Sequence, residues 1–216
     1  MSGVFEFKFS ARAYHFFVDA EGRHSTMHAS DGKKIAVWIA SLFRRPVVVT
    51  DAGACCGGFS CELVSSGLFK AVNVVEINQE RAQNLTLPNI EAAARQQCSV
   101  TPYRVIAKDY TEVMQTLRQD VVFFDPPWGG KDYRRASRVV LGFGAWHLAN
   151  IIIALYRRRH ESGTQLVVFV APWNFALDDM QQQLMEAGLQ CEPCKGLAVR
   201  RFQTFAVHFY SHVFRR

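Results

Sequence analysis

The sequence has no long apolar run, no internal repeat and no low-complexity stretch. Its longest apolar run, around residues 148–156, is much shorter than the roughly 20 residues of a bilayer-spanning helix, so we expect a soluble protein. A secretory leader, with a basic start, an apolar stretch and a cleavage site, is also lacking. We therefore expect the six cysteines to be free thiols in a protein that is not secreted. Cys191 and Cys194 resemble half of a zinc site, but no second Cys or His pair follows, so we predict no metal.

The composition is that of a globular protein that interacts with a polyanion. The 216 residues are 49% hydrophobic and 20% charged, and the net charge is +6. We expect an N-terminal helical segment over residues 1–45 and one compact unit over residues 46–216. Several arginines are adjacent in sequence, as at residues 157–159. Such a surface attracts RNA, although a basic face that is merely solvated would have the same composition.

Short apolar runs alternate with helical patterns and predict an α/β fold with a doubly wound, mostly parallel, seven-stranded sheet. We expect five parallel strands, which lie in the apolar runs at residues 47–52, 71–77, 102–109, 120–125 and 164–172. The tail at residues 202–211 alternates in β fashion and follows residues 190–198 too closely for a helical crossover, so we predict an antiparallel pair. Residues 29–43 form an expected helix, with Ser30 or Asp31 as its N-cap.

Acidic residues end three successive predicted strands, where ligands bind in open α/β sheets. Asp51 precedes a turn that contains Gly53, and glycine lets the backbone approach a ligand closely. Glu76 can accept hydrogen bonds from ribose hydroxyls, and Asp109, beside Tyr110, can accept from an adenine amine. The three-glycine spacing of a dinucleotide site is absent. S-adenosylmethionine, whose ammonium suits an acidic pocket, is therefore the better candidate, while an ordinary strand-to-helix turn is the alternative for the glycines alone.

The run DPPWGGKDY at residues 125–133 is the most specific motif. Two prolines fix the backbone and leave carbonyls without neighbouring N–H groups. Asp125 and the carbonyl of Pro126 can accept both hydrogens of an exocyclic amine and direct its lone pair toward a methyl donor. Trp128 offers a face on which a base stacks, more strongly if the base is cationic. The alternative is a structural turn that packs Trp128 into the core.

At these residues the chain resembles the trimethylguanosine synthase family, whose motif is SPPWGG followed by Pro, an acidic residue and Tyr. The resemblance extends to residues 8–17, to MHASDGKKIA at residues 27–36 and to APWN at residues 171–174. It implies a class I, Rossmann-like methyltransferase that uses S-adenosylmethionine, releases S-adenosylhomocysteine and methylates the guanine N2 amine of a 7-methylguanosine RNA cap. The implied partner is capped small nuclear or nucleolar RNA. We expect a monomer in the nucleus, with the nucleolus favoured and the cytoplasm also open.

The residues themselves and the resemblance together assign roles to individual positions of this chain. Catalysis is assigned to Asp125, Pro126 and Trp128. The cap is expected to contact Lys8, Trp128, Tyr133, Arg134 and Asn174. The donor is expected to contact Phe17, Ser30, Asp31, Asp51, Gly53, Glu76, Ile77, Asp109, Tyr110 and Asp125.

Three positions depart from the family pattern and keep other functions open. Asp125 stands where the family has serine. This change makes the motif more similar to the DPPW and NPPY motifs of adenine-N6 and ribosomal guanine-N2 methyltransferases. Cys55 stands where the donor loop has glycine, so a cap-binding module without catalysis is a further alternative. Trp173 stands where the family has a phosphate-binding arginine, so the phosphates must be held by other groups such as Arg134 or Arg135.

Overall fold

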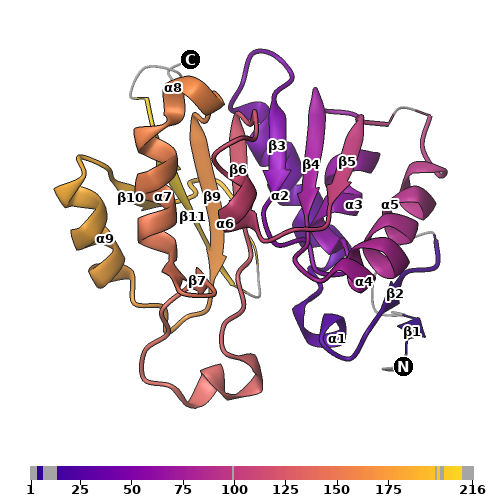
Figure 1. Ribbon diagram of the computed structural model, residues 1–216, viewed down its shortest axis with the longest axis horizontal. Coiled ribbons are helices and arrows are strands. Elements are labelled where there is room, and N and C mark those ends of the chain that lie inside the picture. Colours follow the sequence, from indigo (N-terminus) through magenta and orange to yellow (C-terminus); the bar gives the residue numbers. More distant parts are fainter. Residues whose placement is uncertain (1–3, 7–13, 99, 198, 200–201, 211–216) are drawn as a thin grey trace. The chain divides into compact units, whose positions relative to one another are not determined.

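The computed structural model describes residues 4–6, 14–98, 100–197, 199 and 202–210 (Figure 1). The chain divides into two compact units, Met1–Tyr110 and Thr111–Arg216, which are described in turn. Within the described ranges, no helix has both the length and the apolar character needed to cross a membrane.

The sheet of the first unit contains three parallel strands in the order β3 (Val48–Asp51), β4 (Ala71–Val75) and β5 (Tyr103–Ile106). In the register, Asp51 lies opposite Val74 and Val75 lies opposite Ile106. The carboxyl ends of these strands therefore lie at one edge of the sheet, as the sequence predicts. Valines fill β3 and β4 because these strands are covered on both faces.

Helices follow and precede these strands as the hydrophobic pattern predicts. The chain forms α1 (Gly22–Ser25), α2 (Ala29–Ser41), α3 (Gly58–Ser65), α4 (Gln79–Arg81), the π-helical turn η1 (Ala82–Thr86) and α5 (Leu87–Ala94). α6 (Tyr110–Val113) begins at the last residue of the unit. Two short strands, β1 (Phe5–Glu6) and β2 (Phe17–Val18), pair antiparallel. The N-terminal segment thus contains paired strands in addition to its helices.

The predicted N-cap of α2 is wrong, by two residues for Ser30 and by three for Asp31. The cap is His28, which has an extended backbone and whose Nδ1 accepts the amide N–H of Ser30 at 3.3 Å. Ser30 and Asp31 instead belong to the first turn of the helix. A histidine ring replaces the expected hydroxyl or carboxylate because its Nδ1 can accept the same amide hydrogen.

The second unit contains β6 (Val121–Phe124), β9 (Leu166–Ala171), β11 (Gln203–His208) and β10 (Cys191–Pro193), in the order β10-β11-β9-β6. β6 and β9 are parallel, whereas β11 is antiparallel to both β9 and β10. The predicted antiparallel C-terminal pair is therefore confirmed. The predicted seven-stranded, mostly parallel sheet is also confirmed.

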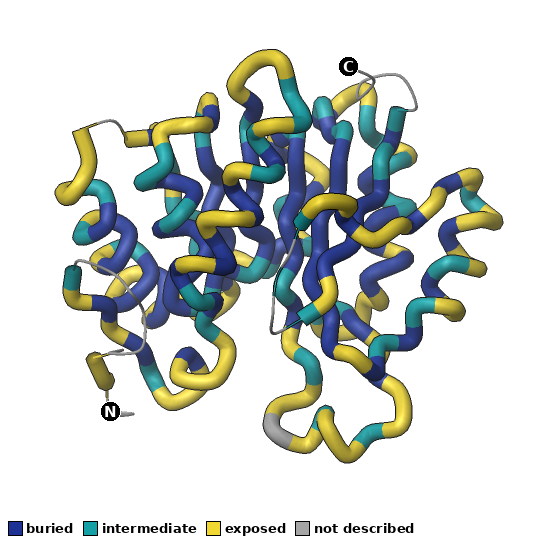
Figure 2. Tube along the Cα trace, turned by 180° about the vertical axis from the view of Figure 1, so that it is seen from behind, coloured by how far each residue is buried: buried dark blue, intermediate teal, exposed yellow. Residues whose placement is uncertain are grey.

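The remaining elements of the second unit are mostly short. They are η2 (Gly130–Arg135), β7 (Gly142–Phe143), β8 (Trp146–His147), α7 (Leu148–Arg157), α8 (Arg159–Ser162) and α9 (Leu177–Glu186). Figure 2 shows that β6 and β9 are buried along their lengths, while the segment that carries η2 is largely exposed. This exposed segment begins at the double-proline turn, which the sequence predicts to contain catalytic residues.

Candidate functional site

Asp51 ends β3 inside the first unit and is 2% exposed. Its Oδ2 accepts a hydrogen bond of 2.6 Å from the hydroxyl of Ser60, near the start of α3. Burial disfavours the ionised carboxylate and raises the pKa of Asp51 to about 6, against the hydrogen bonds donated by Ser60 and by the amide of Gly53. A cationic ligand at this edge of the sheet would favour the ionised form.

Glu76 follows β4, is 4% exposed and fixes the loop after β3. Its Oε2 accepts the amide of Cys55 at 2.8 Å, and its Oε1 accepts the amide of Asn78 at 2.9 Å and Nη1 of Arg81 at 3.2 Å. Burial raises the pKa of Glu76, although these donors favour the charged form. A carboxylate has about four acceptor positions, so Oε2 retains capacity for a further donor.

Cys55 has a left-handed backbone, with φ of 49°. This conformation favours glycine, and a side chain there costs about 1 kcal/mol. The left-handed backbone therefore explains why glycine, which has no Cβ, would suit this position. The hydroxyl of Thr86 donates to the Cys55 carbonyl at 2.5 Å, and Glu76 accepts its amide hydrogen, so both backbone groups are held.

Asn89 connects this loop to the N-terminal segment and was not predicted. It is 1% exposed. Its Oδ1 accepts the amide of Phe17 at 2.9 Å, and its Nδ2 donates to the carbonyls of Phe17 at 2.7 Å and Cys56 at 2.9 Å. The ring of Phe17 is left 41% exposed. Asn89 therefore fixes the backbone of Phe17, which is predicted to contact the methyl donor, next to the loop after β3.

Arg81 makes a second connection between the same two regions and was also not predicted. Its Nε donates to Asp19 at 2.8 Å, its Nη2 to Glu21 and its Nη1 to Glu76. Its side chain is 9% exposed. Burial opposes its charge, but the surrounding carboxylates raise the pKa of Arg81 further above its ordinary value. One buried cation thus holds three acidic residues. One of them, Glu76, is predicted to bind the methyl donor.

The other residues of the first unit that are predicted to contact the methyl donor differ in their exposure to solvent. Asp31 is buried in the first turn of α2 and Tyr110 is 2% exposed, whereas Ile77 is 65% exposed. Ser30 is exposed, and Gly53 and Asp109 are half-buried. Hydrogen bonds directly connect Glu76 to the loop after β3 and connect this loop, through Asn89, to Phe17.

The turn after β6, in the second unit, is held open by two glycines. Gly129 and Gly130 have φ of 93° and 69°, and an added Cβ at either would meet nothing within 4 Å. Glycine is thus required by conformation, not by space. Before them, Pro126 is buried, while Asp125 and Trp128 are half-buried. The indole of Trp128 is thus partly exposed beside this turn, while its Nε1 is buried.

Four of the five predicted cap residues form one cluster, which we call the tryptophan cluster: Trp128, Tyr133, Arg134 and Asn174. The rings of Trp128 and Tyr133 meet edge to face, with centroids 5.2 Å apart. The guanidinium of Arg134 lies 5.7 Å from the centre of the Tyr133 ring. Asn174 Nδ2 donates to the carbonyls of Tyr133 at 2.8 Å and Ala136 at 2.7 Å. The fifth residue, Lys8, lies outside the described residues.

Two polar atoms of the tryptophan cluster are buried without a hydrogen-bond partner in the described part of the chain. They are Nε1 of Trp128 and Oδ1 of Asn174. Buried polar atoms usually have partners, so these two are available to a ligand or to water.

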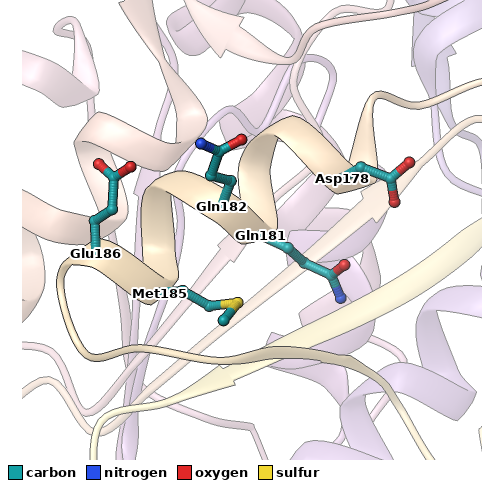
Figure 3. Close-up of a pocket in the computed structure, with 5 residues that line it drawn as sticks. All are labelled: Asp178, Gln181, Gln182, Met185 and Glu186. Atoms are coloured by element: carbon teal, nitrogen blue, oxygen red, sulfur yellow. The ribbon is translucent and has the colours of Figure 1, made fainter.

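A pocket lies on α9. It is lined by Asp178, Gln181, Gln182, Met185 and Glu186, all on the one helix (Figure 3). It includes none of the predicted site residues. In the described ranges, no group of three or more His, Cys, Asp or Glu side chains is arranged to hold a metal ion.

Comparison with known proteins relates the chain to enzymes that modify RNA caps. A family model described as RNA cap guanine-N2 methyltransferase matches residues 47–207, well over half of the chain. An uncharacterized protein of Acanthamoeba polyphaga mimivirus is 28% identical over 140 residues, which cover 65% of this chain and 52% of that protein. The chain thus spans about half the length of this curated relative.

Solved structures support the fold. An inferred S-adenosylmethionine-dependent methyltransferase from Streptococcus mutans matches with a TM-score of 0.55 and 14% identity, over 90% of this chain and 53% of that one. An inferred RNA methyltransferase from Pyrococcus horikoshii matches with a TM-score of 0.50 and 17% identity, over 83% of both chains. TYW2 of M. jannaschii, solved with S-adenosylmethionine, matches with a TM-score of 0.50 and 13% identity, over 92% and 83%. At such identities the likeness concerns the fold, which is that of class I methyltransferases.

Proposed function

Because the chain belongs to the RNA cap guanine-N2 methyltransferase family, we propose that it transfers a methyl group from S-adenosylmethionine to the N2 amine of a 7-methylguanosine RNA cap. The observation that carries this proposal is the tryptophan cluster beside the double-proline turn. It offers a partly exposed indole, a tyrosine and an arginine directly after two acceptors suited to an amine. A cationic, planar base linked to phosphates matches each of these groups.

The acidic residues of the first unit fit the donor. Asp51 would pair with the ammonium group of S-adenosylmethionine, since a nearby cation favours ionisation of a buried carboxyl whose pKa is near 6. Glu76 would accept a ribose hydroxyl on Oε2, and Asp109 would accept from the adenine amine. Phe17, Ser30, Asp31, Gly53, Ile77 and Tyr110 would complete the donor pocket. The bound donor supplies an activated methyl group, so the protein needs no redox chemistry.

The residues of the second unit would hold the acceptor. Asp125 and the carbonyl of Pro126 would each accept one hydrogen of the N2 amine, which directs its lone pair away from them. Trp128 would stack on the 7-methylguanine, whose positive charge strengthens the contact. Arg134, with Lys8, would bind the cap phosphates, and Tyr133 and Asn174 would fix the stacking surface. Fixed geometry would supply much of the rate, because the donor is already reactive.

The substrate test compares a methylated and an unmethylated guanine. Purified protein with labelled S-adenosylmethionine is expected to methylate 7-methylguanosine diphosphate and to leave GDP unmodified, because only the former presents a cationic ring to Trp128. Mass spectrometry of the product nucleoside would locate the new methyl group on N2. Equal transfer to both nucleotides would contradict the proposal.

Trp128→Ala is expected to weaken binding of the cap and to leave binding of the methyl donor unchanged. Stacking contributes about 1–3 kcal/mol per base, so the Kd for 7-methylguanosine diphosphate should rise at least about fivefold. The Kd for S-adenosylhomocysteine, measured by the same calorimetry, should stay within about twofold. Trp128→Phe serves as the control, because it keeps an aromatic face. An unchanged cap affinity in Trp128→Ala would show that the tryptophan is structural.

Two alternatives are favoured by specific residues. Asp125 in place of serine favours an adenine-N6 or ribosomal guanine-N2 methyltransferase, which would methylate uncapped oligonucleotides in the same assay. The side chain at Cys55, in a left-handed backbone, favours a cap-binding module that has lost catalysis. Calorimetry distinguishes that module, since it would bind the cap analogue and neither S-adenosylmethionine nor its product.

The natural substrate and location follow from the family resemblance as proposals. We propose capped small nuclear or nucleolar RNA as the partner, and a nuclear or nucleolar location, for a protein that acts as a monomer. Methylation of such RNA extracted from cells lacking the protein would support this substrate, and size-exclusion chromatography with light scattering would give the oligomeric state.

A further inference from the structure

Two Pro–Trp pairs stand at equivalent places in the second unit. β6 and β9 are parallel neighbours, and Phe124 lies opposite Phe169 in their register. Trp128 follows Phe124 by four residues, and Trp173 follows Phe169 by four residues; each tryptophan is preceded by a proline. Adjacent parallel strands are about 4.8 Å apart. The two tryptophans therefore leave neighbouring strands at the same edge of the sheet.

The two indoles differ in their surroundings. Trp128 is half-buried against the edge of Tyr133. Trp173 is 69% exposed, the highest value among the large hydrophobic residues of the described chain. Most of this aromatic side chain is therefore accessible to a ligand. The residue contributes little to the core and is free to serve as a contact surface.

The turn that carries Trp173 is firmly held. The next residue, Asn174, is 7% exposed and donates to the carbonyls of Tyr133 and Ala136. Its own carbonyl accepts the amide of Val139 at 2.9 Å. These bonds join the turn after β9 to the segment that packs against Trp128. The exposed indole is therefore kept near the tryptophan cluster without being part of the packing of Trp128.

The charge of the same segment favours an anionic partner. Arg134 is exposed, and its Nε donates to the Tyr133 hydroxyl at 3.3 Å. The side chain of Arg135 is 89% exposed and makes only a long, exposed ion pair with Asp132 at 3.8 Å, whereas Arg138 pairs with Asp179 at 2.6 Å. An apolar protein partner would gain nothing from the first two arginines, whereas a nucleotide provides phosphates for them and a base for the indole.

We propose that Trp173 stacks on the base of the nucleotide that follows the cap, so that the protein binds a cap dinucleotide through two aromatic residues, one for each base. The inference rests on the proposed function, since it assigns a second base to the same substrate. It also gives a role to the tryptophan that stands where the resembling family has arginine. Arg134 and Arg135 bind the phosphates that link the two bases.

The test compares substrates with one base and with two. Methyl transfer is measured with 7-methylguanosine diphosphate and with the dinucleotide m7GpppA, using wild type, Trp173→Ala, Trp173→Phe and Met185→Ala. In wild type, the KM for the dinucleotide should be at least about fivefold lower than for the mononucleotide. Trp173→Ala should lose this difference, mainly through a higher KM for the dinucleotide. Trp173→Phe should keep most of it.

Met185→Ala is the matched control, because Met185 is 68% exposed, lies in the last turn of α9 and is not one of the residues of the tryptophan cluster. It should behave as wild type. A preference for the dinucleotide that survives in Trp173→Ala would overturn the inference, as would a wild type without such preference. An equal rise of KM for both substrates would also overturn it, since Trp173 would then contact the cap itself.

The design separates this inference from the proposed function. Failure of wild type to methylate 7-methylguanosine diphosphate would contradict the proposed function. Calorimetry with m7GpppA would still test the second base, because it measures binding in wild type and Trp173→Ala without any methyl transfer. Equal affinity of the two proteins for m7GpppA would then count against Trp173 alone.

Discussion

Asp125→Ala is expected to lower kcat by about a hundredfold or more while the Kd for 7-methylguanosine diphosphate changes much less. The carboxylate directly follows β6 and stands directly before the double proline. It would accept one hydrogen of the N2 amine and so orient the lone pair. Loss of one preorganised hydrogen-bonding group in an active site typically costs about 10²–10³ in kcat. The cap would still be held by Trp128 and by its phosphates.

Conservative variants distinguish orientation of the amine from a role in folding. Asp125→Ser restores the residue of the resembling family and an acceptor oxygen, so it should recover most of the activity. Asp125→Asn keeps one carbonyl acceptor and should lie between serine and alanine. Single-turnover rates at saturating donor, together with cap Kd values, would measure both effects. A cap affinity that falls as far as kcat, or an inactive Asp125→Ser, would contradict this role.

Much of the fold follows from local patterns in the sequence. β3, β4, β6 and β9 were predictable because runs of valine and phenylalanine identify strands buried on both faces. The antiparallel tail was predictable because too few residues precede it for a helical crossover. The N-cap of α2 was not, because histidine is an unusual cap and Ser30 and Asp31 beside it are common ones. The pairing of β1 and β2 was also missed, since two-residue strands have no periodicity to detect.

The candidate site was predictable where its residues share a short motif or end a strand. Asp51 and Glu76 follow from strand ends, and Trp128 follows from the double-proline motif. Asn89 and Arg81 were not predictable, because their partners Phe17 and Asp19 lie 72 and 62 residues away in sequence. Nothing in the local pattern marks either residue, since both lie on helical segments with ordinary composition. Only the folded chain brings these long-range hydrogen bonds together.

Arg81→Met is expected to destabilise the protein by about 3–5 kcal/mol, the cost of removing one partner from a buried ion pair. Arg81 is 9% exposed and holds Asp19 and Glu76, whose side chains are 16% and 4% exposed. Without the guanidinium, these carboxylates stay buried with no cation beside them. Glu76 also loses a donor that fixes it, so the Kd for S-adenosylhomocysteine should rise about tenfold. Urea unfolding and calorimetry measure the two effects.

Glu21→Gln is the matched control for Arg81→Met, because Glu21 binds the same guanidinium with a side chain that is 63% exposed. Its loss should change the free energy of unfolding by less than about 1 kcal/mol. The double variant Arg81→Met with Glu76→Gln should recover part of the stability, since the buried charge is gone. Unfolding free energies of Arg81→Met and Glu21→Gln that agree within error would show that burial does not strengthen this cluster.

The pH dependence of Arg81→Met gives an independent check with a definite sign. Burial already raises the pKa of Glu76 above its ordinary value, and loss of the neighbouring cation should raise it further. A carboxyl whose pKa is higher in the folded than in the unfolded state is stabilising when protonated and loses this contribution as pH rises through the folded value. The deficit of the variant relative to wild type should therefore be greatest near neutral pH and shrink toward about pH 4. A deficit that is constant with pH would mean that Arg81 acts through packing of its aliphatic stem and not through the charge of Glu76.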